Sequence, residues 1–370
     1  MNQGNNKKIL MISTDRKVFE KGSDVRRRFI LYGSLVEELH VIVFAKKSLL
    51  FKQERISENV FLYPTNSSSK LKYMYDATKI GCNITGINLI TTQDPFETGI
   101  VGVELARKLK TRLEIQIHTD FLSKYFKKWD IKNVFRVFLG KYVLKKADCI
   151  RVVSNRIKTS IKVALPHISV TPIVLPVFID INKIKNTPIS VDLHKEYPQF
   201  DHISLMVSRL EKEKDIKRVI KIFSKIVRNY PKSGLVIVGN GSQRKSLESA
   251  VNTLKLTENV IFEGWQEDIV KLVSYYKSAD LFINSSLYEG YGRTLVEALA
   301  SGTSVLSTDV GVATEIGSDI FRTDEELYKK VVEYIDGKEG NVRLKTYPYR
   351  NEEEYLLTMK DGWNRCCRCN

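Results

Sequence analysis

The segment 289–297, which reads Glu-Gly-Tyr-Gly-Arg-Thr-Leu-Val-Glu, holds the sharpest concentration of residues that could do chemistry. Its two glycines interrupt the chain just before an expected short helix. We therefore predict that the backbone N–H groups from Tyr291 to Leu295 form an anion-binding nest at the helix start. The candidate phosphate-binding residues are Gly290, Tyr291, Gly292, Arg293, Thr294 and Leu295.

A carboxylate stands on each side of this nest. Glu289 lies just before it, and Glu297 lies about one turn into the expected helix. An ionised carboxylate only accepts hydrogen bonds, so the pair suits the hydroxyl groups of a ligand whose phosphates the nest would bind. A structural interpretation stays open, in which Glu297 is a helix-surface residue and Glu289 is a charge favoured by the helix dipole.

Two cations follow a different apolar run, at 203–208. Arg209 comes directly after the run, and Lys214 comes five residues later. Because Arg presents a planar fork and Lys a point charge, the two together could neutralise a departing diphosphate. Surface loops also hold such residues by chance, so the position alone leaves both interpretations open.

Two further apolar runs end in residues of interest, one in a pair of glycines and the other in a histidine. Gly239 and Gly241 close the run that begins at residue 235. A residue without a Cβ atom lets a ligand approach the backbone, although an ordinary tight turn has the same sequence. His118 leaves the run 115–117 into a loop, a position that suits catalysis, helix capping or a core contact.

These positions need a framework, and short apolar runs that alternate with helical periodicity provide one. Such runs are typical of strands buried on both faces of a parallel sheet, and their alternation with helices indicates βαβ units. Expected strands in the first half span 8–13, 40–45, 60–63, 88–92, 113–118, 149–154 and 170–175, with helices at 23–39, 96–110 and 121–146. Expected strands in the second half span 203–208, 235–239, 260–264, 280–285 and 304–308, with helices at 214–228, 242–256, 268–277 and 294–300.

The pattern predicts two consecutive Rossmann-like, doubly wound α/β domains. We expect the first at 1–180 and the second at 201–350, with a linker at 181–200 where prolines interrupt any sustained period. A last helix within 351–370 is expected to complete the first domain. Ligands bind such sheets beyond the carboxyl ends of the strands, which is where the candidate residues stand.

The positive charge is confined to one half of the chain. Residues 1–165 hold 31 basic and 15 acidic side chains, whereas residues 166–370 hold 28 of each. A lysine-rich proteome would predict an even spread, so the basic half indicates an anionic partner. In the segment 121–146 aromatic and basic residues are interleaved, which predicts docking on an anionic membrane surface, unless the aromatic residues are core and the lysines a solvated face.

Cysteine usage and hydropathy bear on the compartment. The five cysteines are an odd number, which argues against a disulfide framework and for a reducing environment. The terminal cluster Cys366, Cys367 and Cys369 lacks a second Cys or His pair, so we expect no metal there. No apolar run reaches the roughly 18 residues of a membrane span, and no signal peptide is evident. We expect a cytoplasmic protein, with peripheral attachment to the membrane left open.

In combination, the motifs resemble the retaining GT-B glycosyltransferases of family 4 over nearly the full length of the chain. They occur in the order and spacing of that family. The matching segments are 115–120 (Ile-Gln-Ile-His-Thr-Asp), 207–214 (Val-Ser-Arg-Leu-Glu-Lys-Glu-Lys), 238–241 (Val-Gly-Asn-Gly), 260–264 (Val-Ile-Phe-Glu-Gly), 289–297 and 309–315 (Asp-Val-Gly-Val-Ala-Thr-Glu). The resemblance implies two Rossmann-like domains that face each other across a cleft, with the sugar-nucleotide site on the second.

The resemblance also implies a role for each candidate residue. Arg209 and Lys214 would stabilise the departing diphosphate, Glu297 would bind the ribose, and Glu289 the transferred sugar. His118 would reach the donor sugar, and the loop holding Gly22 and Ser23 would approach the donor phosphate and the acceptor. The chain departs from the family where Ser23 replaces a second glycine, where Asp215 follows Lys214, and in a shorter stretch after residue 317.

The resemblance implies transfer of a sugar from a UDP- or GDP-sugar to a glycan or lipid-linked acceptor, with retention of configuration. The sequence contains no Asp-x-Asp motif, so fixed cations are expected to replace a metal, and no cofactor beyond the donor is expected. Two alternatives stay open: a sugar-nucleotide epimerase of the same fold, and a non-catalytic anion-binding protein. No nucleic-acid-binding motif is recognised, so nucleic acid is not an expected partner.

Overall fold

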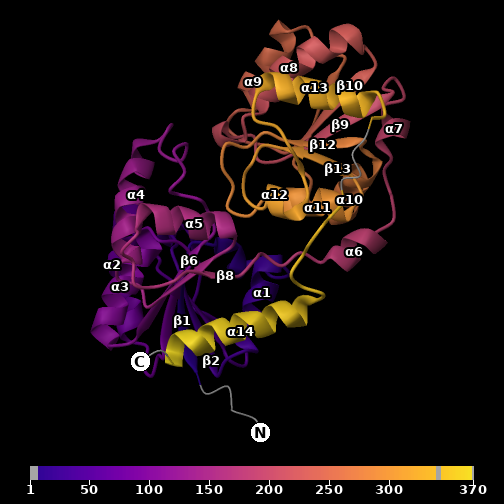
Figure 1. Ribbon diagram of the computed structural model, residues 1–370. Helices are drawn as coiled ribbons and strands as arrows, with labels where there is room; N and C mark the ends of the chain where they lie inside the picture. The colour runs from indigo at the N-terminus through magenta and orange to yellow at the C-terminus, as the bar shows by residue number, and fades with distance from the viewer. Residues whose placement is uncertain (1–6, 339–342, 369–370) are drawn as a thin grey trace. The chain divides into compact units, whose positions relative to one another are not determined.

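The computed structural model describes residues 7–338 and 343–368, which form two compact units. Within these residues, the first unit comprises 7–122, 130–176 and 351–368, and the second comprises 123–129 and 177–350. Each unit contains one predominantly parallel sheet covered by helices (Figure 1). This architecture confirms the predicted pair of doubly wound α/β domains.

The first sheet has eight strands in the order β3-β4-β2-β1-β5-β6-β7-β8, and every neighbouring pair is parallel except β3 with β4. Its central strands are buried, as their continuous apolar sequences require. The strands are β1 (Lys8–Ser13), β2 (Glu38–Val43), β3 (Glu54–Ser57), β4 (Val60–Pro64), β5 (Leu89–Thr92), β6 (Arg112–Ile117), β7 (Cys149–Val152) and β8 (Ile173–Val174).

Helices cover both faces of this sheet (Figure 1). One face holds α1 (Asp24–Gly33) and α14 (Glu352–Arg368), and the other holds α2 (Tyr73–Cys82), α3 (Glu97–Leu109) and α4 (Ile131–Leu144). The unit also contains α5 (Asn155–Ala164) and the single-turn helices η1 (Arg16–Phe19), η2 (Lys47–Leu49) and η3 (Lys70–Lys72). Within the described part of the chain, no helix is both long and apolar enough to span a bilayer.

Two helices are shorter than the sequence predicted. The helix expected at 121–146 begins only at Ile131, because the Asp130 side chain accepts a hydrogen bond from the Lys132 N–H at 2.9 Å and so caps the helix there. The helix expected at 23–39 ends at Gly33, because the chain must turn to enter β2 at Glu38.

The C-terminal helix α14 returns to the first unit and packs on β5 and β6. Trp363 is fully buried there, and its indole N–H donates to Glu114 at 3.3 Å.

Cys366 of the same helix forms a disulfide with Cys149 of β7. The prediction against disulfides was therefore wrong, and the cysteine count no longer argues for a reducing compartment. The two cysteines lie 217 residues apart, so only the return of α14 brings them together. Cys369, part of the cluster considered for metal, lies outside the described residues.

The second sheet has six parallel strands in the order β11-β10-β9-β12-β13-β14. They are β9 (His202–Val207), β10 (Ser233–Val238), β11 (Val260–Gly264), β12 (Leu281–Asn284), β13 (Ser304–Ser307) and β14 (Asp319–Ile320). The helices around them are α8 (Ile216–Asn229), α9 (Arg244–Thr253), α10 (Ile269–Ser278), α11 (Arg293–Ala300), α12 (Ala313–Ile316) and α13 (Asp324–Ile335), with η4 (Lys212–Lys214) before α8.

The segment 181–200, which the sequence predicted to be a linker, is folded onto the second unit. It contains α6 (Ile181–Asn186) and α7 (Leu193–Glu196). The Leu193 side chain is fully buried, and its N–H donates to the Ser278 hydroxyl at 3.1 Å. The prolines that interrupt the sequence pattern keep these helices short, so no period was detectable.

Candidate active site

The loops at the carboxyl ends of β9, β10, β12 and β13 are tied together at one edge of the second sheet. The ties are backbone hydrogen bonds between loops that are far apart in the sequence. They join the N–H of Leu210 to the carbonyl of Asn240, that of Leu287 to Glu213 and that of Val312 to Tyr291, at 2.9, 2.8 and 2.9 Å. The predicted residues of the second half therefore share one preorganised loop cluster, as parallel strands require.

Gly239 and Gly241 bring two of these loops into close contact. Gly239 has φ = +137°, and a Cβ atom there would lie 1.8 Å from the Ser208 carbonyl oxygen. A Cβ atom on Gly241 would lie 2.5 Å from the Leu210 carbonyl oxygen. Since protein backbone fills the space that a side chain would need, these glycines position the loop of Arg209. Direct contact of either glycine with a ligand stays a prediction.

Lys214 and Glu289 form an ion pair at the centre of the cluster. Their side chains are only 13% and 17% exposed, and the Ser286 hydroxyl donates to the same Glu289 oxygen at 2.8 Å. The sequence suggested that the two residues bind different groups of a ligand. The structure shows that they also form an ion pair with each other. A cation and an acceptor at one point suit a ligand in which a phosphate adjoins hydroxyl groups.

Arg209 lies beside this pair and is more accessible. Its guanidinium contacts Glu213 at 3.0 Å, and its side chain is 67% exposed. The neighbouring Tyr288 has its pKa raised to about 12, first by burial and then by the charge of Glu213. Phe126 packs edge-on against the Tyr288 ring at 5.8 Å. The predicted site residues did not include Glu213, Tyr288 and Phe126, because nothing in their own segments indicates that they meet.

The start of α11 has a backbone geometry that allows the predicted nest, and binding of an anion there stays a prediction. Gly292 precedes the helix with φ = +93°, and no side chain caps the helix start. The N–H of Leu295 donates to the Gly292 carbonyl at 3.1 Å, and the Leu295 side chain is fully buried. Leu295 thus anchors the helix, which limits the candidate phosphate-binding N–H groups to earlier positions such as Arg293 and Thr294.

Glu297 is held in a fixed orientation. One carboxylate oxygen accepts a hydrogen bond from Arg293 at 3.2 Å, and the other accepts one from the hydroxyl of Tyr276 at 3.3 Å. Burial, with the nearby Glu297 charge, raises the pKa of Tyr276 well above its usual value. These contacts do not fit a solvated helix-surface residue. They hold the carboxylate in position, and its contact with a ribose stays a prediction.

His118 lies on the first unit, at the carboxyl end of β6. Its Nε2 is 3.1 Å from the Gln116 side-chain oxygen. Its ring is exposed in part, yet desolvation by the surrounding protein, with the positive charges of Arg151 and Arg28, lowers its pKa to about 3. The imidazole is therefore neutral near pH 7 and can orient a ligand without acting as a cation.

Gly22 and Ser23 lie between η1 and α1, also on the first unit. Gly22 has φ = +81°. Ser23 caps α1: its hydroxyl accepts the Arg26 N–H at 3.2 Å and donates to the Lys17 carbonyl at 2.6 Å. The hydroxyl is thus engaged in capping, so a contact with donor phosphate would come from the backbone of this loop.

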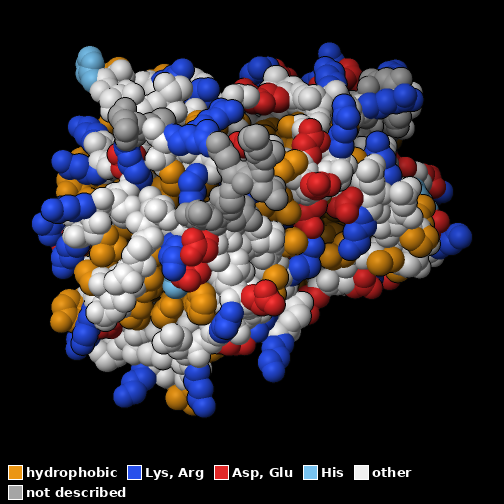
Figure 2. Space-filling model, turned by 90° about the horizontal axis from the view of Figure 1, so that it is seen from below, with side chains coloured by type: hydrophobic (Ala, Val, Ile, Leu, Met, Phe, Trp, Pro, Cys, Tyr) orange, Lys and Arg blue, Asp and Glu red, His pale blue; other side chains and the backbone are white. Residues whose placement is uncertain are grey.

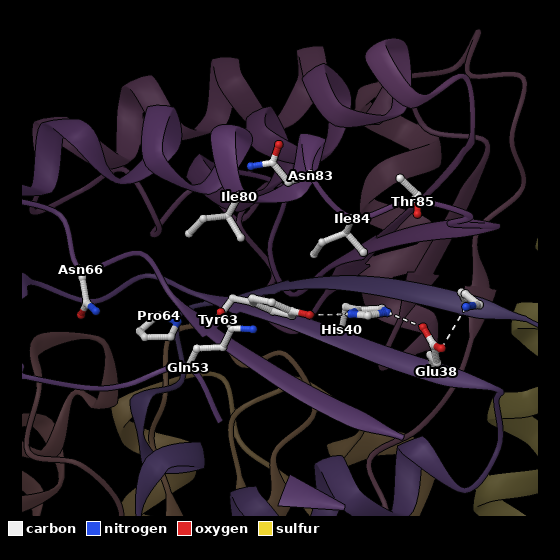
Figure 3. A pocket seen from close by; sticks show the side chains of 11 residues that line it. Glu38, His40, Gln53, Tyr63, Pro64, Asn66, Ile80, Asn83, Ile84 and Thr85 are labelled. Atoms are coloured by element: carbon white, nitrogen blue, oxygen red, sulfur yellow. Dashed lines mark hydrogen bonds and ion pairs between the residues drawn. The ribbon is translucent and has the colours of Figure 1, made fainter. Parts of the chain in front are cut away.

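A separate cavity of about 590 Å³ lies between α2 and the first sheet (Figure 3). His40 is central to its polar wall, with Tyr63 at 3.0 Å on one ring nitrogen and Glu38 at 2.9 Å on the other. Lys8 pairs with the second oxygen of Glu38 at 2.9 Å. These groups satisfy one another, so we assign no ligand to this cavity.

The described residues 7–338 and 343–368 contain no group of three or more His, Cys, Asp or Glu side chains arranged to hold a metal ion. The candidate site consists instead of paired ions and the start of a helix.

Two Rossmann-like units, with cations and carboxylates at the carboxyl edge of the second sheet, define the GT-B class of fold. The sequence model of the glycosyl transferases group 1 matches residues 194–335, which lie within the second unit. The matched region includes all the candidate residues on the second unit.

The chain is also similar in sequence to curated proteins that are named as a glycosyltransferase and a synthase. The chain is 26% identical over 272 residues to an uncharacterised glycosyltransferase of Methanocaldococcus jannaschii, covering 71% of this chain and 64% of that protein. It is 28% identical over 230 residues to the alpha-monoglucosyldiacylglycerol synthase of Streptococcus pneumoniae, covering 60% of this chain and 52% of that protein. These alignments thus span between about half and two thirds of the relatives' own length.

Solved structures share the fold over nearly the whole chain. Sucrose-phosphate synthase from Thermosynechococcus elongatus has a TM-score of 0.77 at 19% identity, covering 97% of this chain and 99% of that one. Anabaena HepE in complex with UDP-glucose has a TM-score of 0.67 at 19% identity, covering 97% and 94%. At this identity the likeness shows the fold alone.

Proposed function

We propose that this protein transfers a sugar from a UDP- or GDP-sugar to an acceptor hydroxyl, with retention of the anomeric configuration and without a metal ion. The observation that carries the proposal is the mostly buried Lys214–Glu289 pair, with Arg209 and the start of α11 in the same loop cluster. HepE, which has the same fold, was crystallised with UDP-glucose, which supports a nucleotide-sugar donor.

In the proposed reaction the bond between the anomeric carbon and the diphosphate oxygen breaks. Lys214, Arg209 and the N–H groups at the start of α11 stabilise the negative charge that forms on the diphosphate, because preorganised donors and cations act most strongly where charge develops. Glu289 accepts hydrogen bonds from the sugar, and Glu297 does so from the ribose. The acceptor oxygen bonds to the same face of the sugar, and its proton passes to the departing phosphate oxygen.

Lys214 must leave Glu289 in part when the diphosphate arrives. The existing pair keeps a cation in a poorly solvated position, where a lone charge would be costly. The donor diphosphate then takes over part of the contact with Lys214, and Glu289 becomes available to accept hydrogen bonds from the sugar. This exchange is a physical reason for placing a carboxylate beside the cation.

The acceptor is proposed to be a glycan or a lipid-linked group. The basic first half of the chain favours an anionic acceptor or an anionic surface around it. The name of the Streptococcus pneumoniae relative indicates a glycolipid product, which supports the lipid alternative. Nucleic acid is not proposed as a partner.

Nucleotide binding tests the donor site before any acceptor is known. A ligand that binds only the native state raises the melting temperature, so UDP or GDP should stabilise the protein. Lys214→Ala should remove most of this stabilisation, whereas Lys212→Ala, on the same turn but exposed, should retain it. Equal stabilisation of both variants would contradict the role of Lys214.

The reaction itself is tested with labelled nucleotide sugars. Transfer to an acceptor, or slow hydrolysis that releases the free sugar, is expected. Interconversion of the nucleotide sugar without release would identify an epimerase. Nucleotide binding without any turnover across donors and acceptors would favour the non-catalytic alternative.

A further inference from the structure

Helix α4 has two apolar faces, only one of which serves the fold. The inner face packs on the unit through Gly140, Val143 and Leu144, which are buried. The outer face carries Ile131, Phe135, Phe138 and Tyr142, all at least half exposed. Their spacing of four, three and four residues places them on a single stripe, opposite the buried residues. Nothing in the core requires this stripe.

The surroundings of the stripe are strongly basic. The segment 124–146 contains eight Lys or Arg residues and a single acid, Asp130, whose side chain caps the helix. Lys132, Lys145 and Lys146 are exposed. Arg136 differs, because it is half-buried and pairs with Glu97 at 3.0 Å. An exposed apolar stripe between lysines fits a surface that is anionic outside and apolar just beneath.

A second apolar and basic cluster lies at the same edge of the first sheet. Leu50, Leu71 and Tyr75 are each at least 70% exposed. They follow β2 and β4, just as α4 follows β6, and the carboxyl ends of parallel strands share one edge. Lys46, Lys47, Lys52, Lys70 and Lys72 stand among them, all exposed. Figure 2, which views the molecule from below, shows basic side chains among hydrophobic ones on the left part of the visible surface.

We propose that the outer face of α4 is a docking surface for an anionic lipid bilayer. Ile131, Phe135, Phe138 and Tyr142 insert at the level of the headgroups, and the lysines beside them contact lipid phosphates. Each basic side chain near an anionic bilayer contributes about 1 kcal/mol, so several lysines with a short apolar stripe suffice for reversible attachment. The sequence predicted docking through the whole segment 121–146. Because Phe121 and Phe126 are buried, the proposed docking surface is limited to α4.

The position of α4 in the chain links this surface to the candidate active site. Asp130 alone separates α4 from the segment 123–129, which belongs to the second unit and places Phe126 against Tyr288, next to Glu289. Docking through α4 would therefore affect the position of a segment that contacts the loop of Tyr288 and Glu289, where we propose that the donor binds.

Vesicle co-sedimentation tests the docking surface independently of sugar transfer. The protein should bind phosphatidylcholine vesicles that contain phosphatidylglycerol, bind pure phosphatidylcholine weakly, and lose binding as salt is added. Phe135→Ser together with Phe138→Ser should lower vesicle affinity by about tenfold or more, since each substitution removes an aromatic ring that is exposed in the protein and would enter the bilayer. Val163→Ser, which changes an equally exposed apolar residue on α5 of the same unit, should bind like the unchanged protein.

Two further measurements make each outcome decisive. The double variant should have the melting temperature of the unchanged protein without UDP, and the same increase when UDP is added. This separates lost docking from lost folding and from failure of the donor site. Equal recovery with neutral and anionic vesicles, or unchanged binding of the double variant, would overturn the proposal. A concentration-dependent dimer that the double variant abolishes, without vesicle binding, would assign the stripe to a second copy of the chain and also overturn it.

Discussion

The two units use charge in opposite ways. At the candidate active site of the second unit, Lys214 is matched to Glu289, Arg209 to Glu213 and Arg293 to Glu297. On α4 of the first unit, Lys132 and Lys145 stand exposed beside an apolar stripe. The first arrangement fixes a few groups in place, and the second spreads charge over a surface.

The difference follows from what each kind of ligand requires. A small ligand must be oriented, so its binding groups are preorganised by partners that it can replace. A surface needs no single geometry, so long side chains are left free in water and act together through their summed field. The neutral second half and the strongly basic first half fit the two proposals.

The largest expected effect would come from breaking the paired arrangement in the second unit. Arg209→Ala should lower kcat by about 10²–10³-fold, the scale of losing one preorganised electrostatic partner. Because Arg209 is mostly exposed, the melting temperature should hardly change. Turnover of the purified variant on a labelled donor measures this. Lys217→Ala, an exposed cation on the neighbouring helix α8, is the control. Near-full turnover of the Arg209 variant would remove the residue from the mechanism.

A second prediction concerns the stability of the first unit alone. Cys366→Ser removes the disulfide to Cys149 and should lower the free energy of unfolding by about 2–4 kcal/mol. Nucleotide binding by the second unit should persist at temperatures below the transition. Thermal unfolding with and without reductant measures this, with Cys82→Ser, a free exposed cysteine, as the control. If the denatured, unreduced protein reacts with thiol reagents at all its cysteines, the bond is absent.

A third, smaller effect concerns the pH dependence of the first unit. The pKa of His118 is about 3 in the folded protein and near 6.5 when unfolded, so the unfolded state binds the extra proton first as the pH falls. His118 should therefore reduce stability as the pH drops from about 6.5 toward 3. His118→Gln should flatten that part of the stability curve, measured by denaturant unfolding at several pH values. An identical slope in the variant would contradict the lowered pKa.

The smallest expected effect is that of chelation. Since cations of the chain itself are proposed to face the diphosphate, turnover should be unchanged in excess EDTA. Complete loss of activity, restored by magnesium or manganese, would show that the paired charges of the second unit serve another purpose.

The sequence by itself determined the framework and most of the residues of interest. Apolar runs and their spacing predicted the strands of both sheets except β3 and β14, because a strand buried on two faces has little freedom of composition, whereas these two short strands lie at sheet edges. The two glycines near Glu289 and the cations after β9 were visible because chemistry of this kind needs those residue types locally. Boundaries were less accurate: Asp130 starts α4 ten residues later than expected, since one capping side chain outweighs a long periodic pattern.

Only the tertiary structure decided which of these residues meet. Lys214 and Glu289 are 75 residues apart, and Cys149 and Cys366 are 217 apart, so local pattern carries no sign of either contact. The structure likewise divided the aromatic residues of 121–146 into core and surface, because burial depends on what packs against a helix. Residue types and their periods are properties of short segments, whereas contacts, burial and pKa shifts belong to the folded chain.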